Sequence, residues 1–241
     1  MDTATAEQLI TLNKQFYQTF GREFSSTRQR LQPGVKRILE RVTGDESILD
    51  LGCGNGGLAR ELARRGHRGS YTGLDLSLPL LSETGGLPVN FSFAQADLTS
   101  PDWDGKLITE HWSLITAFAI FHHIPSRELR VRILNKVHAL LRPGGQFIHS
   151  EWQFLNSEKL RGRIQLWREA GLSEADVDPN DYLLDWRSGG RGLRYVHQFD
   201  EAELETLATA SRFRVRETFR ADGMTGSLGL YQVWEPNPPP D

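Results

Sequence analysis

A glycine-rich segment near residue 50 is the first feature of the sequence that could do chemistry. An apolar run that contains Asp50 leads directly into Gly52, Gly54 and Gly57. Glycines let the backbone approach a ligand closely and accept positive φ angles. Their spacing, G-x-G-x-x-G, also occurs in dinucleotide-binding turns. The segment therefore predicts a ligand-binding turn between a strand and a helix, and by itself it leaves the ligand open.

Three aspartates are expected around that turn. Asp50 precedes the glycines, Asp75 ends a predicted strand at 70–75, and Asp97 follows another at 89–94. Asp75 is placed to accept hydrogen bonds from both hydroxyls of a ribose. Asp97 could accept from an adenine amino group, and Asp50 could face an ammonium, whereas carboxylates would repel a pyrophosphate. The set favours a cationic sulfonium nucleoside as ligand; the alternative is that Asp75 and Asp97 are ordinary turn residues.

The elements that must position these residues follow from the hydrophobic periodicity of the chain. Helices are expected at 5–20, 33–43, 57–65, 78–84 and 126–141 and after Asp200, and strands at 47–51, 70–75, 89–94, 113–118, 146–152, 213–220 and 228–234. Strands that alternate with helices imply a parallel sheet, and the short link between the last two strands demands an antiparallel pair. The predicted fold is α/β and doubly wound (Rossmann-like), with a mostly parallel seven-stranded sheet and an antiparallel C-terminal strand pair.

The length of the chain suits one domain, expected over residues 1–235. Residues 1–44 would form a helical lid. Residues 153–199, which look poor in strand signal, would form an insertion over the carboxyl ends of the strands, where open α/β sheets bind ligands. The tail at 236–241 is expected to be disordered.

Composition narrows the function further. The formal net charge is −3, so the bulk charge does not indicate nucleic-acid binding, and the single cysteine, Cys53, excludes an intrachain disulfide or a cysteine-based zinc site. The N-terminus lacks signal-peptide features and no apolar run is long enough to cross a bilayer. We therefore expect a cytoplasmic protein without a metal site or a membrane partner.

Roughly residues 45–152 resemble the class I S-adenosylmethionine methyltransferases. The resemblance rests on the glycine turn, the three aspartates, the segment from Phe118 to Pro125, and Arg142-Pro-Gly-Gly145, which ends the helix before it. The resemblance implies S-adenosylmethionine as cofactor. The cofactor-binding residues that we expect are Tyr17, Asp50, Gly52, Gly54, Asp75, Leu76, Asp97, Leu98, Ala117, Phe118 and His122, although Tyr17 could instead only pack its helix against the core. Among these, Asp50, Gly52 and Gly54 would contact the methionine part, Asp75 the ribose, and Asp97 and Leu98 the adenine.

Segments outside that core bear on the methyl acceptor. Four short segments resemble the tRNA wobble-uridine methyltransferases that esterify 5-carboxymethyluridine: Phe16-Tyr17, Phe24 to Arg28, Asp181 to Arg187 and Leu193 to Phe199. The resemblance implies tRNA as a partner and a small zinc-binding activator subunit. The residues expected to serve the acceptor are Arg28, His123, Arg194, Tyr195 and His197. In an extended segment Tyr195 and His197 would share one face and Arg194 would lie on the other.

Several alternatives stay open at this point. Arg28 could bind the carboxylate of the cofactor instead of an acceptor. Residues 14–41 carry seven Lys or Arg against two Glu, and residues 186–197 carry three Arg and no acid, which fits an RNA footprint but also an ordinary exposed helix. The leading hypothesis is methylation of a carboxylate on a wobble uridine of tRNA. A metabolite methyltransferase and a non-catalytic cofactor-binding partner protein are the other two.

Overall fold

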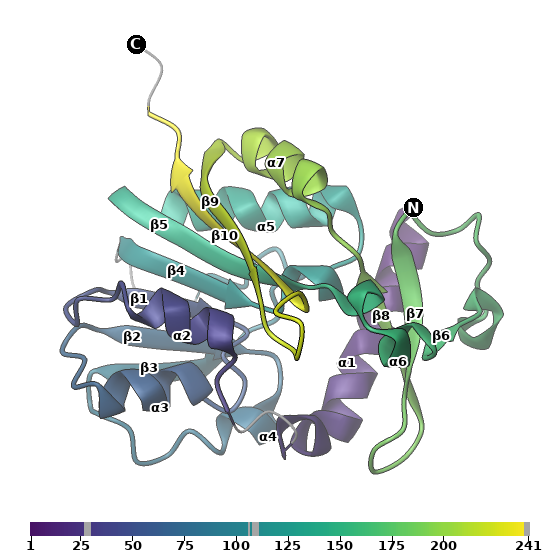
Figure 1. Cartoon of the computed structure of the whole chain (residues 1–241), viewed down its shortest axis with the longest axis horizontal. Coiled ribbons are helices and arrows are strands. Elements are labelled where there is room, and N and C mark those ends of the chain that lie inside the picture. The colour runs from purple at the N-terminus through teal and green to yellow at the C-terminus, as the bar shows by residue number, and fades with distance from the viewer. Residues whose placement is uncertain (27–29, 106, 108–110, 239–241) are drawn as a thin grey trace.

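The computed structural model describes residues 1–26, 30–105, 107 and 111–238. Its centre is a seven-stranded sheet in the order β3-β2-β1-β4-β5-β10-β9 (Figure 1). The strands are β1 (Ile48–Leu51), β2 (Tyr71–Asp75), β3 (Phe91–Gln95), β4 (Trp112–Phe118), β5 (Leu141–Trp152), β9 (Phe213–Ala221) and β10 (Gly229–Pro236). The first five pair in parallel, and β10 lies antiparallel between β5 and β9. The predicted fold class is confirmed.

Helices cover both faces of this sheet (Figure 1). They are α2 (Pro33–Leu39), α3 (Gly57–Arg64), α4 (Leu78–Leu81), α5 (Arg127–Leu140) and α7 (Glu201–Ala210). Residues of α2 and α3 pack in one hydrophobic cluster with the sheet, and residues of α5 and α7 pack in another. The carboxylate of Asp200 accepts from the Glu203 amide, which caps α7 as the sequence indicates.

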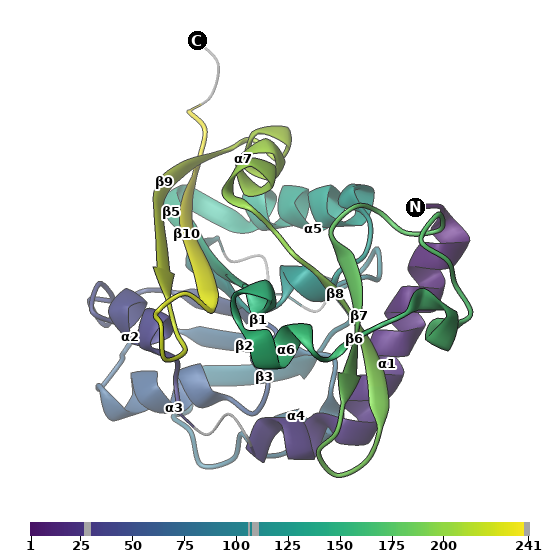
Figure 2. The same cartoon turned by 45° about the vertical axis from the view of Figure 1, so that its right-hand side comes forward.

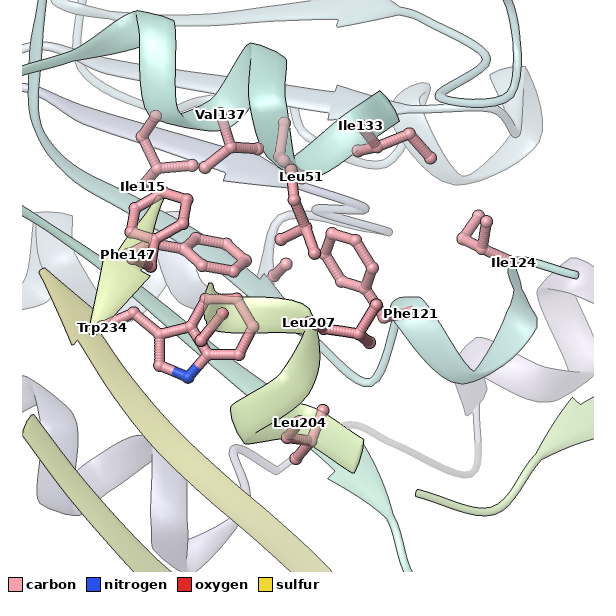
Figure 3. Packing of buried hydrophobic residues seen from close by; sticks show 14 of the residues in the cluster. Leu51, Ile115, Phe121, Ile124, Ile133, Val137, Phe147, Leu204, Leu207 and Trp234 are labelled. Atoms are coloured by element: carbon pink, nitrogen blue, oxygen red, sulfur yellow. The ribbon is translucent and has the colours of Figure 1, made fainter. Parts of the chain in front are cut away.

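The cluster under α5 explains why that helix forms where it does. Ile133 and Val137 of α5 project onto Ile115 and Phe147 of the sheet, while Leu204 and Leu207 of α7 and Trp234 of β10 close the cluster (Figure 3). The apolar positions of α5 recur every three or four residues, so they form one stripe that the sheet buries. The helix ends at Leu140, one residue before the predicted end, and β5 begins at once instead of at residue 146. Residues 142–145 form an irregularity in its pairing with β4.

Residues 153–199 contain more regular structure than the sequence suggests. They form η2 (Phe154–Asn156), α6 (Glu158–Arg161), β6 (Ile164–Gln165), η3 (Trp167–Ala170), β7 (Asp181–Trp186) and β8 (Gly192–His197). The three strands make an antiparallel sheet, so the expectation of a strand-poor insertion was wrong. The pattern of alternation was hidden because Asp181, Arg194 and His197 are polar and yet buried.

The N-terminal helix α1 (Thr3–Ser26) packs along β8 of this smaller sheet (Figure 2). Asn13 of α1 fixes the contact, because its amide oxygen accepts from the Tyr195 amide at 2.8 Å and its Nδ2 donates to the Tyr195 carbonyl at 3.1 Å. Leu9 of α1 is fully buried against Trp167 and Leu183. The helix and the small sheet therefore form one packed unit beside the carboxyl ends of the central strands.

Candidate active site

The glycine turn follows β1 and is shaped by backbone geometry. Gly52 and Gly54 have φ angles of +73° and +56°. The amides of Gly52 and Cys53 both donate to the carbonyl of Leu74, which ties the turn to β2. A Cβ at Gly52 would lie 1.9 Å from Cδ1 of Ile120, whereas one at Gly54 would meet nothing within 4 Å. Glycine is therefore required at position 52, and the turn has open space beside position 54.

Asp75 stands at the end of β2, facing this turn. Its two oxygens accept from the amides of Gly54 and Ser77, both at 2.8 Å. Burial raises the pKa of Asp75, although these two amides counteract the effect. A carboxylate oxygen can accept more than one hydrogen bond, so Asp75 can also accept from a ligand hydroxyl. Asp75 is thus held in the position that a ribose-binding residue needs.

Asp97 follows β3 and faces the N-terminal helix. One oxygen accepts from the amide and the hydroxyl of Thr99, and the other lies 2.5 Å from Nζ of Lys14 in α1. Partial burial works against ionisation, but the Lys14 ammonium and the Thr99 hydroxyl lower the pKa of Asp97 below its usual value. A charged acceptor therefore stands on the wall where the sequence predicts adenine binding.

A first cavity of about 260 Å³ opens at these strand ends. Its lining includes the predicted residues Tyr17, Gly52, Gly54, Asp75, Leu76, Asp97, Leu98, Phe118 and His123. Lys14 and Asn13 also line it, and both come from α1, where sequence reasoning found no candidate besides Tyr17. Glycine backbone, a carboxylate for ribose and a second carboxylate for an amino group lie on one wall. This donor set fits an adenosyl group.

A second cavity of about 430 Å³ lies next to the first, and the two share Gly52, Asn55, Phe118 and Ala119. Sequence reasoning missed most of its lining, which includes Arg30, Glu151, Trp152, Asp222 and Tyr231. One signal in the sequence could have placed Trp152 and Tyr231 together. Trp152 ends β5 and Tyr231 lies near the start of β10, and neighbouring antiparallel strands bring those ends together.

Asp50 lines the second cavity rather than the first. Its carboxylate accepts from the Tyr71 hydroxyl at 2.6 Å and the Thr116 hydroxyl at 2.7 Å. Burial raises the pKa of Asp50 to about 6, against the effect of these hydrogen bonds. If Asp50 faces the ammonium of a methionine group, as the sequence predicts, the ammonium must approach from the second cavity.

The pKa of Asp50 gives a testable pH dependence. Its carboxyl group takes up a proton at a higher pH in the folded chain than in the unfolded chain, where the value is 3.8. The folded state therefore binds more protons between about pH 4 and 6, and the free energy of unfolding should fall by roughly 3 kcal/mol as the pH rises through that window. Urea unfolding of the wild type and Asp50→Asn at several pH values checks this, because the variant should lose that fall. Parallel curves for both proteins would contradict it.

Tyr17 and His123 meet at the mouth of the first cavity. The Tyr17 hydroxyl lies 2.7 Å from Nε2 of His123, and Nδ1 of His123 lies 3.3 Å from the Tyr195 carbonyl. A carbonyl only accepts, so Nδ1 of His123 carries a proton and donates to the Tyr195 carbonyl. The pair therefore links α1, the loop after β4 and the small sheet at the cavity.

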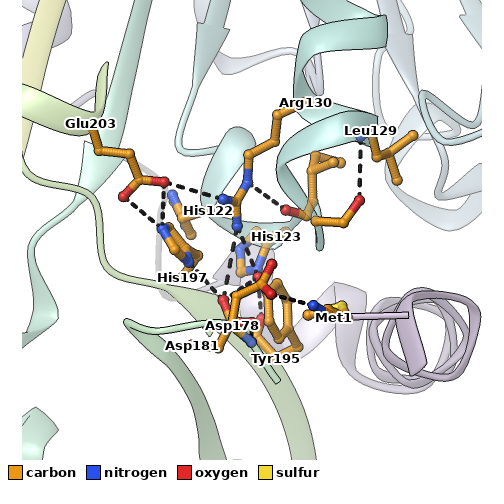
Figure 4. A network of polar contacts seen from close by, with 12 residues as sticks. Met1, His122, His123, Leu129, Arg130, Asp178, Asp181, Tyr195, His197 and Glu203 are labelled. Atoms are coloured by element: carbon orange, nitrogen blue, oxygen red, sulfur yellow. Dashed lines mark hydrogen bonds and ion pairs between the residues drawn. The ribbon is translucent and has the colours of Figure 1, made fainter. Parts of the chain in front are cut away.

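Four predicted residues occupy other positions than expected. Ala117 is fully buried in the core under α5, and His122 donates its amide to Glu151 at 3.0 Å and lines neither cavity. Tyr195 and His197 do share one face, as predicted, but that face is interior: both bind Oδ1 of Asp181 at 2.6 Å (Figure 4). A ligand contact needs a side chain that reaches a cavity, and none of these four does.

Arg194 is also buried, and its guanidinium lies 4.8 Å from the ring centre of Trp152 and 5.5 Å from that of Phe16. It lines neither cavity. Its place is between the small sheet and aromatic side chains from α1 and β5, where a guanidinium gains from contact with ring faces. Arg28 lies outside the described residues, so its predicted role stays a prediction.

The face shared by Tyr195 and His197 belongs to a buried ionic network. Arg130 of α5 donates to the Tyr195 hydroxyl at 2.9 Å and lies 3.3 Å from Glu203 of α7. Nε2 of His197 lies 2.9 Å from the same glutamate. Figure 4 shows how these side chains converge from α5, α7 and the small sheet. The network holds the insertion against the main domain.

Comparisons with known proteins agree with this geometry. Residues 22–218 match a family described as a methyltransferase domain. The chain belongs to this family. It is a methyltransferase, and the lining of the first cavity fits S-adenosylmethionine as its cofactor. The fold is that of an S-adenosylmethionine-dependent methyltransferase from Methanosarcina mazei, with a TM-score of 0.64 and 23% identity over 86% of this chain and 98% of the other. Residues around the first cavity, above all Asp75 and Asp97, would hold the cofactor.

Two curated relatives of the methyltransferase carry substrate names. The tRNA (carboxymethyluridine(34)-5-O)-methyltransferase of Mus musculus is 26% identical over 172 residues, which are 68% of this chain and 23% of that enzyme. The trans-aconitate 2-methyltransferase of Pseudomonas paraeruginosa is 33% identical over 131 residues, 51% of this chain and 42% of that enzyme. The matches thus span less than half the length of either relative.

Among the described residues, no helix is both long and apolar enough to span a membrane.

Proposed function

We propose that this methyltransferase esterifies the carboxylate of a modified wobble uridine in tRNA. The acids that line the second cavity carry the proposal, because each is already engaged by donors of the chain. Asp50 accepts from Tyr71 and Thr116, and Asp222 accepts from the Gly34 amide and the Tyr231 hydroxyl. Hydrogen bonds to the ionised form stabilise a carboxylate and make it a weaker general base.

Glu151, the third acid of this cavity, is also engaged. Its carboxyl group accepts from the amide of His122, and burial raises its pKa well above the usual value. Burial therefore favours the neutral form, which leaves less negative charge to repel an anionic acceptor. Arg30 lines the same cavity and supplies a cation.

A carboxylate acceptor suits such a cavity because it arrives already ionised. With the cofactor bound, one carboxylate oxygen would attack its methyl carbon, a C–O bond would form as the C–S bond breaks, and the C–S electron pair would stay on sulfur, so the chain would not have to move a proton. The enzyme then has to align the two groups, and alignment can contribute about 7–11 kcal/mol. A guanidinium such as that of Arg30 can hold the second carboxylate oxygen. Both named relatives act on acceptors that carry carboxylates.

A small carboxylic acid is the second candidate, and the similarity to the trans-aconitate enzyme favours it. The two candidates share the reaction and differ in the size of the acceptor. The acid would be an isolated metabolite in one case and a group on a nucleobase in the other.

Labelled methyl transfer separates the candidates. Total tRNA from a strain that lacks the protein should gain label, and digestion with mass spectrometry should place it on one uridine derivative. Mild alkali should release that label as methanol, because an ester hydrolyses where an N-methyl or ether group does not. The Asp75→Ala variant is the control for dependence on the cofactor site. Label in a metabolite extract alone would reject tRNA, and alkali-stable label would reject a carboxylate.

A further inference from the structure

Exposed arginines gather where α2 meets the edge strand β9. Arg37 and Arg41 come from α2 and its end, and Arg214 and Arg216 come from β9. Their side chains are 50%, 44%, 51% and 54% exposed. We name these four residues the arginine face.

Two glutamates hold the arginine face in place. Glu217 binds both Arg37, at 2.9 Å, and Arg41, at 2.5 Å. Glu235 binds both Arg214, at 3.2 Å, and Arg216, at 3.1 Å. The glutamates are only 29% and 24% exposed, so the guanidinium groups lie further out. Because each carboxylate is shared by two cations, the four arginines keep two positive charges in excess.

The arginine face is continuous across the two elements. Val233 of β10 packs in the same cluster as Val35 and Ile38 of α2. Glu235 lies two residues further along the strand, so it points to the same side of the sheet. Glu217 pairs with Val233 across the strands. Both glutamates, and the arginines that they bind, therefore lie on the α2 side of the sheet edge.

Both elements of the arginine face lead to the second cavity. Arg30 and Gln32, just before α2, line that cavity, and so does Asp222, just after β9. The Gly34 amide donates to Asp222 at 2.9 Å, which joins the two ends. Figure 2 shows the end of β9 and the following turn near α2. From Arg214 to Asp222 an extended strand covers about 26 Å, a length that spans several nucleotides.

We propose that the arginine face binds the phosphate backbone of the RNA acceptor while the modified base enters the second cavity. This rests on the proposed function and adds the surface that tRNA would use. Guanidinium groups bind phosphate oxygens in pairs of hydrogen bonds, and carboxylates that already fix their orientation lower the entropic cost of binding. The alternative is that the charges of the arginine face only protect the edge strand β9 from pairing with another chain.

The test is a pair of double variants with equal change in charge. Arg41→Gln with Arg216→Gln removes two cations from the arginine face. Arg64→Gln with Arg68→Gln removes two arginines that also pair with carboxylates, Glu61 and Asp45, and are 70% and 71% exposed. The first double variant should raise the Kd for unmodified tRNA by about tenfold or more at 50 mM salt. It should also reduce the magnitude of the slope of log binding constant against log salt concentration by roughly 1 to 2. The control pair should change the Kd by less than threefold and the salt slope by less than half a unit.

Further measurements separate charge from structure. The pair Arg41→Lys with Arg216→Lys keeps both charges and should retain most of the salt slope. Methyl transfer to the free nucleoside 5-carboxymethyluridine should proceed equally in the wild type and the Gln pair, with the loss confined to KM for tRNA. Equal losses in both Gln pairs, or an unchanged KM for tRNA in the first, would overturn the inference. If the wild type methylates no tRNA and yet the first pair alone loses tRNA binding, the proposed function fails and the RNA-binding surface stands.

Discussion

Replacing Asp75 with alanine should weaken the binding of S-adenosylmethionine by at least about a hundredfold. The carboxylate lines the first cavity, where it can accept from ligand hydroxyls, and it also holds the amides of Gly54 and Ser77. The variant would lose two charge-assisted hydrogen bonds to the ribose, each worth about 1.5–3 kcal/mol. It would also release the glycine turn. Calorimetric titration with the demethylated product measures the change directly.

The matched control for this experiment is Asp45→Ala. Asp45 is exposed, pairs with Arg68 at 2.7 Å and lines neither cavity. Its loss should leave the Kd of the cofactor within about twofold and the fold intact. An Asp75→Ala protein that still melts cooperatively and binds within threefold of the wild type would show that the ribose is held elsewhere.

Replacing Asp181 with alanine should lower the free energy of unfolding by about 3–5 kcal/mol. Its carboxylate binds the Tyr195 hydroxyl and His197, both at 2.6 Å, and lies 3.9 Å from the guanidinium of Arg130. All of these side chains are buried. Removing the acid leaves a buried cation with one acceptor fewer, and breaking buried ion pairs has costs of this size.

Urea unfolding with Asp176→Ala as the control checks this prediction. Asp176 lies five residues before Asp181 and is exposed, and its carboxylate accepts from the amide and hydroxyl of Ser173. Its loss should leave the urea midpoint of unfolding nearly unchanged, as is usual for exposed sites. If the Asp181 and Asp176 variants unfold at the same urea concentration, the network contributes little and the insertion is held by its apolar contacts.

The parts of the fold that sequence reasoning predicted are those that depend on local pattern. The stripe of Ile133 and Val137 and the cap at Asp200 can be recognised within one or two turns of chain. Asp75 and Asp97 could be placed together because the carboxyl ends of parallel strands meet at one edge. Predicted residues at the strand ends therefore meet in the lining of the first cavity, whereas the residues that α1 contributes, Asn13 and Lys14 among them, were missed apart from Tyr17.

The parts that were missed depend on contacts between distant segments. The second cavity combines Arg30, Trp152 and Tyr231, and nothing in the local sequence of any one of them indicates the other two. Alternation correctly paired Tyr195 with His197, but it does not say which face is interior. Polar residues suggested a ligand there, whereas the structure satisfies them with Asp181 and Arg130 of its own chain.

The network around Arg130 limits how the insertion can be treated in engineering. Acceptor-specificity segments are often exchanged between related enzymes as modules. Here Arg130 and Glu203 belong to the main domain, while Asp181, Tyr195 and His197 belong to the insertion. A chimaera that received residues 153–199 from a relative would keep Arg130 and Glu203 but lose the side chains of the insertion that they contact. Grafts should therefore be made with α5 and α7 included, or not at all.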